Sequence, residues 1–391
     1  MGTGTRARSQ AGARCRSSSP WASLAFVVSR TEVDEGGPVA KISTRMGDGY
    51  AIELTADELR RDLAEGTEAA ASRARIPPLD SNEIDYLFDL FAYQGRIAGV
   101  QPGNEVVLTK DGCANTLYNG QMSSGVGVPL AREQGIRVME RAFGFDTMEV
   151  GHPDYSFKPA KSLVALEQMC MEQALIDCVV PLFYGAMPNM GLYFRPDGPF
   201  ANPADLLPRG EIEAARETQV EAAEALRRDM VNMALSMAAV GADGIDFDTT
   251  ASAGDAEFLA TLQAVEELSD STDLAIEVGM ATELVLGFHG ELEYMGTRLA
   301  GLWPHQQVKV VEQAGAHIFG PASTTNTSKS APWNVSRAVT FVKECSRVAT
   351  IPIHANVGMG VGGVPTSEVQ PSDVVTRAGV ALVEIGRADG L

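Results

Sequence analysis

The sequence predicts an α/β fold, a (β/α)8 TIM barrel that here lacks its last βα unit. From residue 161 onward, amphipathic stretches alternate with short apolar runs, as in parallel sheets covered by helices. Connections into the runs are short, whereas those after them are long and rich in Gly, Pro, Ser and Asn, which favours a barrel with its site at the strand ends. Seven strands are found before the last residue, and a doubly wound open sheet is the alternative.

The predicted strands are short and mostly β-branched or aromatic. They cover residues 145–150, 179–184, 244–248, 274–278, 317–319, 351–355 and 380–385. Apolar spacing predicts helices over residues 163–174, 211–240, 256–268, 305–314, 333–348 and 372–378. The longest helix, which ends at a glycine, has a buried stripe formed by Ala223, Leu226, Met230, Met233 and Met237.

The N-terminal lead differs from the rest in composition. Residues 1–30 contain five arginines and no acidic residue. Such a lead matches either a targeting segment or an extraneous stretch upstream of a true start near Val39, and we prefer the second interpretation. We therefore assign residues 1–38 to an extraneous or disordered lead, 39–140 to a helical and loop segment packed on the barrel, and 141–391 to the incomplete barrel.

Composition excludes several classes of protein. The 391 residues include 31 basic and 51 acidic side chains, a net charge of −20, which disfavours nucleic-acid binding. The five cysteines are scattered without CxxC pairs, so we expect a reducing compartment, no disulfide scaffold and no structural zinc. Proline and glycine interrupt the longest uncharged stretches, which excludes membrane spans. We expect a cytoplasmic homo-oligomer.

Acidic residues at two neighbouring strand ends are the candidate catalytic groups. Asp246 and Asp248 share one face of their strand, because side chains alternate, and Asp248 lies at its end. Glu277 lies at the end of the next strand. Carboxylates buried there would need an amine, a cation or a hydrogen-bond network as partner. A carboxylate that caps a helix or pairs with arginine is an equally open alternative.

Three further residues at strand ends are candidate substrate-binding groups. Tyr184 ends the second strand, and His354 and Asn356 end the sixth, so all three could line the same mouth. A lone histidine is more often a hydrogen-bonding group than a metal ligand. The remaining histidines are dispersed, and we predict no metal site.

The sequence lacks the residues that several other enzyme mechanisms require at the expected positions. None of the seven lysines lies inside a predicted strand, which disfavours a Schiff-base mechanism, and no GxSxG motif is present. The glycine-rich residues 358–363 follow a strand, but Pro365 comes next and no helix opens there. We interpret them as a loop shaped for a ligand or partner rather than as a phosphate cradle.

Several strings of residues resemble a known family. They are GFDTME (144–149), GHPDYSFKP (151–159), VPLFYGAMPNMG (180–191), GADGIDFDTTASAG (241–254), LAGLWPHQQ (299–307), NTSK (326–329) and NVGMGVGG (356–363). In this order they resemble the dimethylamine:corrinoid methyltransferases of methylamine-using methanogens and some bacteria, from about residue 45 to residue 391.

The resemblance implies a TIM barrel that transfers a methyl group from dimethylamine to a cognate corrinoid protein, in methylamine metabolism and methanogenesis. The family carries pyrrolysine, encoded by an amber codon, after a segment resembling residues 383–391. We therefore expect pyrrolysine just after Leu391, a chain stopped at that codon, and no activity for the truncated chain. No cofactor is expected to bind directly, because the partner protein carries the cobalamin-type corrinoid.

The pyrrolysine imine can add an amine, and the candidate residues would act around it. Asp248 or Glu277 would stabilise positive charge and handle a proton, while Tyr184, His354 and Asn356 would shape the pocket. Two alternatives remain open at this point. One is a pyrrolysine-independent corrinoid methyltransferase for another methylated amine, and the other is an inactive truncated barrel that binds the corrinoid protein.

Overall fold

The computed structural model describes residues 41–109, 114–117, 128–131, 148–157, 182–188, 190–239, 241–358, 360–366 and 370–391. The chain divides into two units, Met1–Pro38 and Val39–Leu391, and all the described residues belong to the second. The expected helix over residues 163–174 lies outside the described residues.

A six-stranded sheet contains the main strands, in the order β12-β9-β8-β7-β6-β3. Their bounds are Ile318–Pro321 (β12), Ala275–Ala281 (β9), Gly244–Phe247 (β8), Leu182–Pro188 (β7), Met148–Phe157 (β6) and Leu108–Thr109 (β3). Strands β7, β8, β9 and β12 are parallel, which confirms the predicted α/β class. Strand β6 is antiparallel to both of its neighbours. The expected parallel direction is wrong there, because an apolar run does not encode strand direction.

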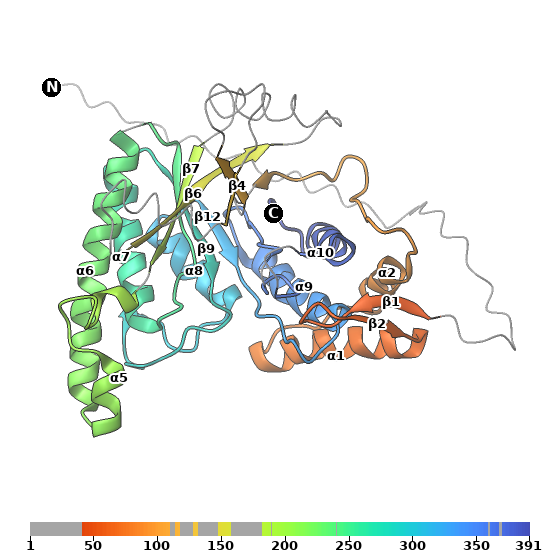
Figure 1. Ribbon diagram of the computed structural model, residues 1–391, viewed down its shortest axis with the longest axis horizontal. Helices are drawn as coiled ribbons and strands as arrows, with labels where there is room; N and C mark the ends of the chain where they lie inside the picture. The colour runs from red at the N-terminus through yellow and green to blue at the C-terminus, as the bar shows by residue number, and fades with distance from the viewer. Residues whose placement is uncertain are drawn as a thin grey trace, which may run out of the picture. The chain divides into compact units, whose positions relative to one another are not determined.

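Four long helices follow the parallel strands in the chain. They are α6 (Ile212–Ala239), α7 (Asp255–Ser271), α8 (Pro304–Ala314) and α9 (Ala331–Val348), close to the predicted ranges. In Figure 1, α6, α7 and α8 lie beside one another along the sheet, and each contacts the next. All five residues of the predicted stripe in α6 are buried.

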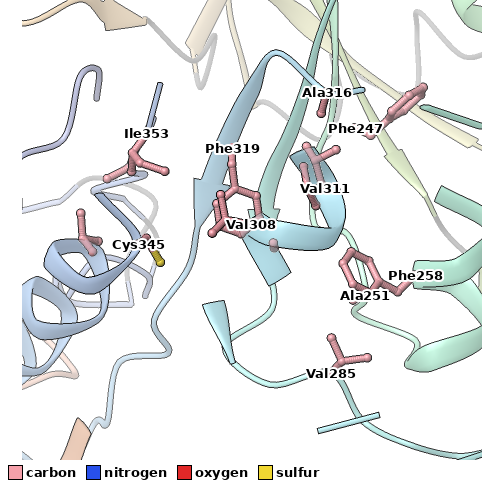
Figure 2. Packing of buried hydrophobic residues seen from close by; sticks show 14 of the residues in the cluster. Phe247, Ala251, Phe258, Val285, Val308, Val311, Ala316, Phe319, Cys345 and Ile353 are labelled. Atoms are coloured by element: carbon pink, nitrogen blue, oxygen red, sulfur yellow. The ribbon is translucent and has the colours of Figure 1, made fainter. Parts of the chain in front are cut away.

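The face of the sheet that packs against the helices is apolar. Ile245 and Phe247 of β8, Val278 of β9 and Phe319 of β12 are completely buried. Figure 2 shows Phe319 packed with Val308 of α8. Because side chains alternate along a strand, the residues between these apolar positions lie on the opposite face.

The expected strand over residues 380–385 is wrong, because the structure has a helix, α10, over Ser372–Glu384. Every residue from 377 to 384 is buried. A helix that is buried on all sides is apolar all round, so its sequence does not show apolar residues at the helical spacing of 3.6. Its continuous β-branched run then looks the same as the sequence of a buried strand. After this helix, Gly390 forms bridges to other parts of the chain.

The predicted strand over residues 351–355 forms only single bridges, and so does the segment at Gly390, after α10. Ile353 bridges to Phe319 of β12, His354 bridges to Gly390, and Gly390 bridges to Val107, which precedes β3. All three bridges are parallel. Pairing thus continues from one edge strand of the sheet to the other through bridged residues rather than through further strands.

An N-terminal layer packs against α9. It comprises the hairpin β1 (Ile42–Arg45) and β2 (Ala51–Leu54), and helices α1 (Ala56–Ala74) and α2 (Ser81–Ala92). Helix α1 begins with a capping box in which Thr55 and Glu58 each bond the other's backbone. Small elements complete the structure: β4 (Ala114–Leu117), β5 (Val128–Ala131), η1 (Met190–Tyr193), α5 (Pro203–Leu206), η2 (Leu207–Arg209), β10 (Glu293–Tyr294) and β11 (Thr297–Arg298).

Helices α1 and α9 approach closely at Gly66. A Cβ atom on Gly66 would lie 2.2 Å from the carbonyl oxygen of Trp333. The contact is extended by hydrogen bonds from Ser336 Oγ to the Leu63 carbonyl (2.7 Å) and from Thr340 Oγ to Thr67 Oγ (2.9 Å). Glycine is therefore required for this approach, although it is a poor helix former.

The substitution Gly66→Ala should lower the free energy of unfolding by about 2 kcal/mol, because the clash with the Trp333 backbone outweighs the gain in helix propensity. Gly379→Ala in α10 is the matched control, since its nearest neighbour is the Leu391 Cδ1 atom at 3.4 Å. The control should range from neutral to about 1 kcal/mol stabilising. Urea unfolding followed by circular dichroism measures both, and a fully stable Gly66→Ala protein would contradict the packing described.

Candidate functional site

Two acidic residues lie at the same level on the face of the sheet that is turned away from Ile245 and Phe247. Asp246 of β8 and Glu277 of β9 are register partners, and both residues are buried. Cα atoms of such partners are about 4.8 Å apart. Gly279 makes room for the first of them, because a Cβ atom on Gly279 would lie 2.3 Å from Asp246 Oδ1.

Glu277 is hydrogen-bonded to His354. The Glu277 Oε1 and His354 Nδ1 atoms are 2.5 Å apart, and the side chains are 7% and 21% exposed, respectively. A carboxylate accepts hydrogen bonds, so the Nδ1–H tautomer of His354 fits this contact. The His354 backbone is fixed by its N–H bond to the Phe319 carbonyl (3.0 Å) and by the bridge to Gly390. The structure thus brings two of the predicted site residues together.

The other predicted residues occupy separate positions. Asp248 is buried just after β8, and its Oδ1 atom accepts the N–H of Thr249 (2.7 Å). Asn356 Oδ1 accepts the N–H of Gly358 (2.8 Å). Tyr184 pairs with Ile245 of β8 in the register of β7. Their roles in a pocket remain predictions.

Sequence reasoning missed Glu257, a completely buried carboxyl group in the first turn of α7. Its oxygens accept the N–H groups of Ala251 (2.8 Å) and Ala253 (2.6 Å) and the hydroxyl of Ser252 (3.3 Å). Burial raises the pKa of Glu257 to about 7, and the hydrogen bonds oppose this shift. The only signal in the sequence is an acid in the first turn of a helix, which usually indicates an exposed cap.

A second buried carboxylate, Asp255, holds the loop after β9. It accepts the N–H groups of His289 (3.2 Å) and Gly290 (2.7 Å). Gln219 of α6 connects the two loops, because its amide bonds both His289 Nε2 (2.9 Å) and the Ala253 carbonyl (3.1 Å). Burial lowers the pKa of His289, which keeps the imidazole neutral.

The glycine-rich loop packs tightly against the protein. Gly360 has a φ of 85°, and its carbonyl accepts the Thr325 N–H (2.7 Å). Cβ atoms would lie 2.1 Å from the Asn356 carbonyl oxygen at Gly362 and 2.7 Å from the Val335 Cα atom at Gly363. These two glycines therefore serve close packing on the backbone and on the start of α9.

Another buried ion pair joins the loops at the ends of β9 and β12. Arg337 of α9 bonds Glu283, the Ser323 hydroxyl and the Thr324 carbonyl.

Within the described ranges, no group of three or more His, Cys, Asp or Glu residues could hold a metal ion. None of the helices seen there is long and apolar enough to cross a bilayer.

Comparison with known proteins gives one result for nearly the whole chain. The sequence model of a family described as dimethylamine methyltransferase matches residues 40–391. No solved structure matches the chain.

The raised pKa of Glu257 predicts how stability changes with pH. The folded protein binds this proton more tightly than the unfolded chain does, so the contribution is present at low pH and is lost as the pH rises from 4.5 to about 7. The amount is on the order of 3 kcal/mol. Glu257→Gln cannot titrate. The stability advantage of the wild type over this variant should therefore be larger at pH 5 than at pH 8 in chemical unfolding, and an equal difference would refute the shift.

Proposed function

The chain belongs to the dimethylamine methyltransferase family, and we propose that it transfers a methyl group from dimethylamine to a cognate corrinoid protein, giving monomethylamine. Family membership indicates a methyltransferase. The corrinoid acceptor, the setting in methylamine metabolism and methanogenesis, and the cytoplasmic location belong to the proposal. A closed TIM barrel is also part of the proposal. It is supported by the bridges that lead from Phe319 through Ile353, His354 and Gly390 to Val107.

The contact of buried Glu277 with partly buried His354 is the observation that carries the proposal. Dimethylamine is a cation at neutral pH, and buried carboxylates favour a positively charged partner. A neutral amine is a poor methyl donor, because the leaving group would be an amide anion. The protein must therefore keep positive charge on the nitrogen while the methyl group leaves. The acidic face of β8 and β9 supports this requirement.

The residues near Gly390 fit the pyrrolysine expected after Leu391. A Cβ atom on Gly390 would lie 3.4 Å from His354 Cδ2, whereas Leu391 Cδ1 lies 3.4 Å from the corresponding position on Gly379 of α10. Gly390 thus faces His354, and Leu391 faces the helix. If the chain continues as an extended strand from Gly390, alternation would bring the proposed pyrrolysine to the His354 side. Pyrrolysine would supply an electrophilic imine carbon there.

The chain's own residues would hold the amine and move its proton. His354 Nε2 accepts the proton that the alkylammonium ion must lose to become a nucleophile, and Glu277 stabilises the resulting imidazolium. Asp248, at the end of the adjacent strand, stabilises positive charge on nitrogen. Tyr184 and Asn356 shape the walls of the pocket in this proposal.

Methyl transfer should be measured with the intact gene product from its native host and reduced corrinoid protein. We expect methylation of the corrinoid, followed by its visible absorption, with dimethylamine as the preferred donor over monomethylamine and trimethylamine. An intact product that ignores dimethylamine would contradict the proposed substrate.

Mass spectrometry of the same preparation tests the electrophile. A peptide that spans Leu391 should continue with a residue of the mass of pyrrolysine. A polypeptide that ends at Leu391 and still demethylates dimethylamine would overturn this part of the proposal.

Glu277→Gln and His354→Gln should each lower kcat by about 10²- to 10⁴-fold, because both disrupt the proton acceptor. His317→Asn is a matched control, since His317 is exposed and its Nδ1 atom only accepts the N–H of Ile276 (3.1 Å). The control should retain activity within about twofold. Wild-type rates in both site variants would remove these residues from the mechanism.

A further inference from the structure

The first turn of α7 contains two completely buried carboxyl groups, and each binds a different loop. Glu257 accepts hydrogen bonds from residues 251–253, in the loop after β8. Asp255 accepts them from His289 and Gly290, in the loop after β9. The first loop begins with Asp248, just after β8, and the second leaves the carboxyl end of β9, which carries Glu277. One helical turn therefore holds both sides of the candidate site.

The loop after β8 has a strained backbone. Thr249 has a φ of 53° and Ala251 a φ of 63°, in the left-handed region that side chains with a Cβ atom rarely adopt. Such conformations persist only when the surrounding structure over-determines them, and they cluster at functional sites. The Glu257 carboxyl supplies that restraint, because it bonds the N–H groups of Ala251 and Ala253 within the same turn.

The restrained loop orients Asp248. The N–H of Thr249 donates to Asp248 Oδ1 (2.7 Å), so the conformation of Thr249 sets the direction of this carboxylate. Thr250 then fastens the loop to the neighbouring strand end, because its hydroxyl donates to the Gly279 carbonyl (3.3 Å) and its own carbonyl accepts the Thr282 N–H (3.1 Å). The segment that Glu257 restrains is thus continuous with the residue whose N–H bonds Asp248.

We infer that Glu257 is a positioning residue, which holds the loop over residues 249–253 so that Asp248 is oriented for the substrate ammonium group. This inference rests on the proposed function for the role of Asp248, whereas the restraint of the loop by Glu257 stands independently of it. Asp255 holds the loop over residues 286–290 and provides the natural comparison.

Hydrogen exchange tests the restraint without any assay of activity. In full-length protein, Glu257→Gln and Glu257→Asp should each speed exchange of the amides at residues 251–253 by about tenfold or more, and leave residues 289–290 unchanged. Asp255→Asn should give the opposite pattern. Two Glu257 variants are used because one of them can fail to fold, and the exchange measurement needs only one folded variant. Unchanged exchange at 251–253 in a folded Glu257 variant would overturn the inference.

A double-mutant cycle tests the link to Asp248 in the methyl-transfer assay. Asp248→Asn and Glu257→Gln should each lower kcat/KM for dimethylamine, by about tenfold, and the double variant should be no worse than the Asp248→Asn variant. Asp255→Asn combined with Asp248→Asn should be additive. Full additivity for Glu257 and Asp248 would reduce Glu257 to a structural role and overturn its assignment.

The two experiments separate the possible failures. If the wild-type enzyme does not demethylate dimethylamine, the proposed function fails, and the exchange experiment still decides whether Glu257 restrains the loop. If the enzyme is active and the cycle is additive, the proposed function stands and the positioning role is refuted.

Discussion

The need to satisfy buried carboxyl groups determines how the strand ends and their loops are built. Asp255, Glu257 and Glu277 are each less than a tenth exposed, and such groups are costly to bury without donors. Backbone N–H groups serve the first two, and an imidazole serves the third. Each solution ties a loop or a strand end to a fixed place. Acidic residues therefore hold the loops in place here, and some of them are also candidate catalytic residues.

The sheet separates structural and chemical roles between its two faces. Large apolar side chains from β8, β9 and β12 pack toward the helices, as Figure 2 shows for Phe319 and Val308. The other face carries Asp246 and Glu277. Gly279 lies beside Asp246, and its missing Cβ atom leaves the space that the Asp246 carboxylate fills.

This arrangement suits a methyltransferase of the dimethylamine family. In the proposed reaction, the protein would keep an amine nitrogen positively charged and take up a proton beside it. A carboxylate bonded to an imidazole meets the second need, and neighbouring carboxylates meet the first. The rigid attachment of both loops to α7 is consistent with this use, since charges stabilise a reacting group best when they need not reorganise. The proposed function and the built features of the site therefore point in the same direction.

The sequence by itself determined the family, through motifs along nearly the whole chain. It also determined the parallel core strands and helices α6 to α9, because alternation and apolar period are local properties. It predicted Glu277 and His354 singly, as residues at strand ends. Only the tertiary structure decided that they bond each other across 77 positions, that β6 is antiparallel, and that residues 380–384 are helical. The burial of Glu257 was equally hidden. The Glu277–His354 contact, the strand direction, the helix and the burial of Glu257 all depend on residues that are distant in the sequence. A local sequence pattern contains information only about neighbouring positions.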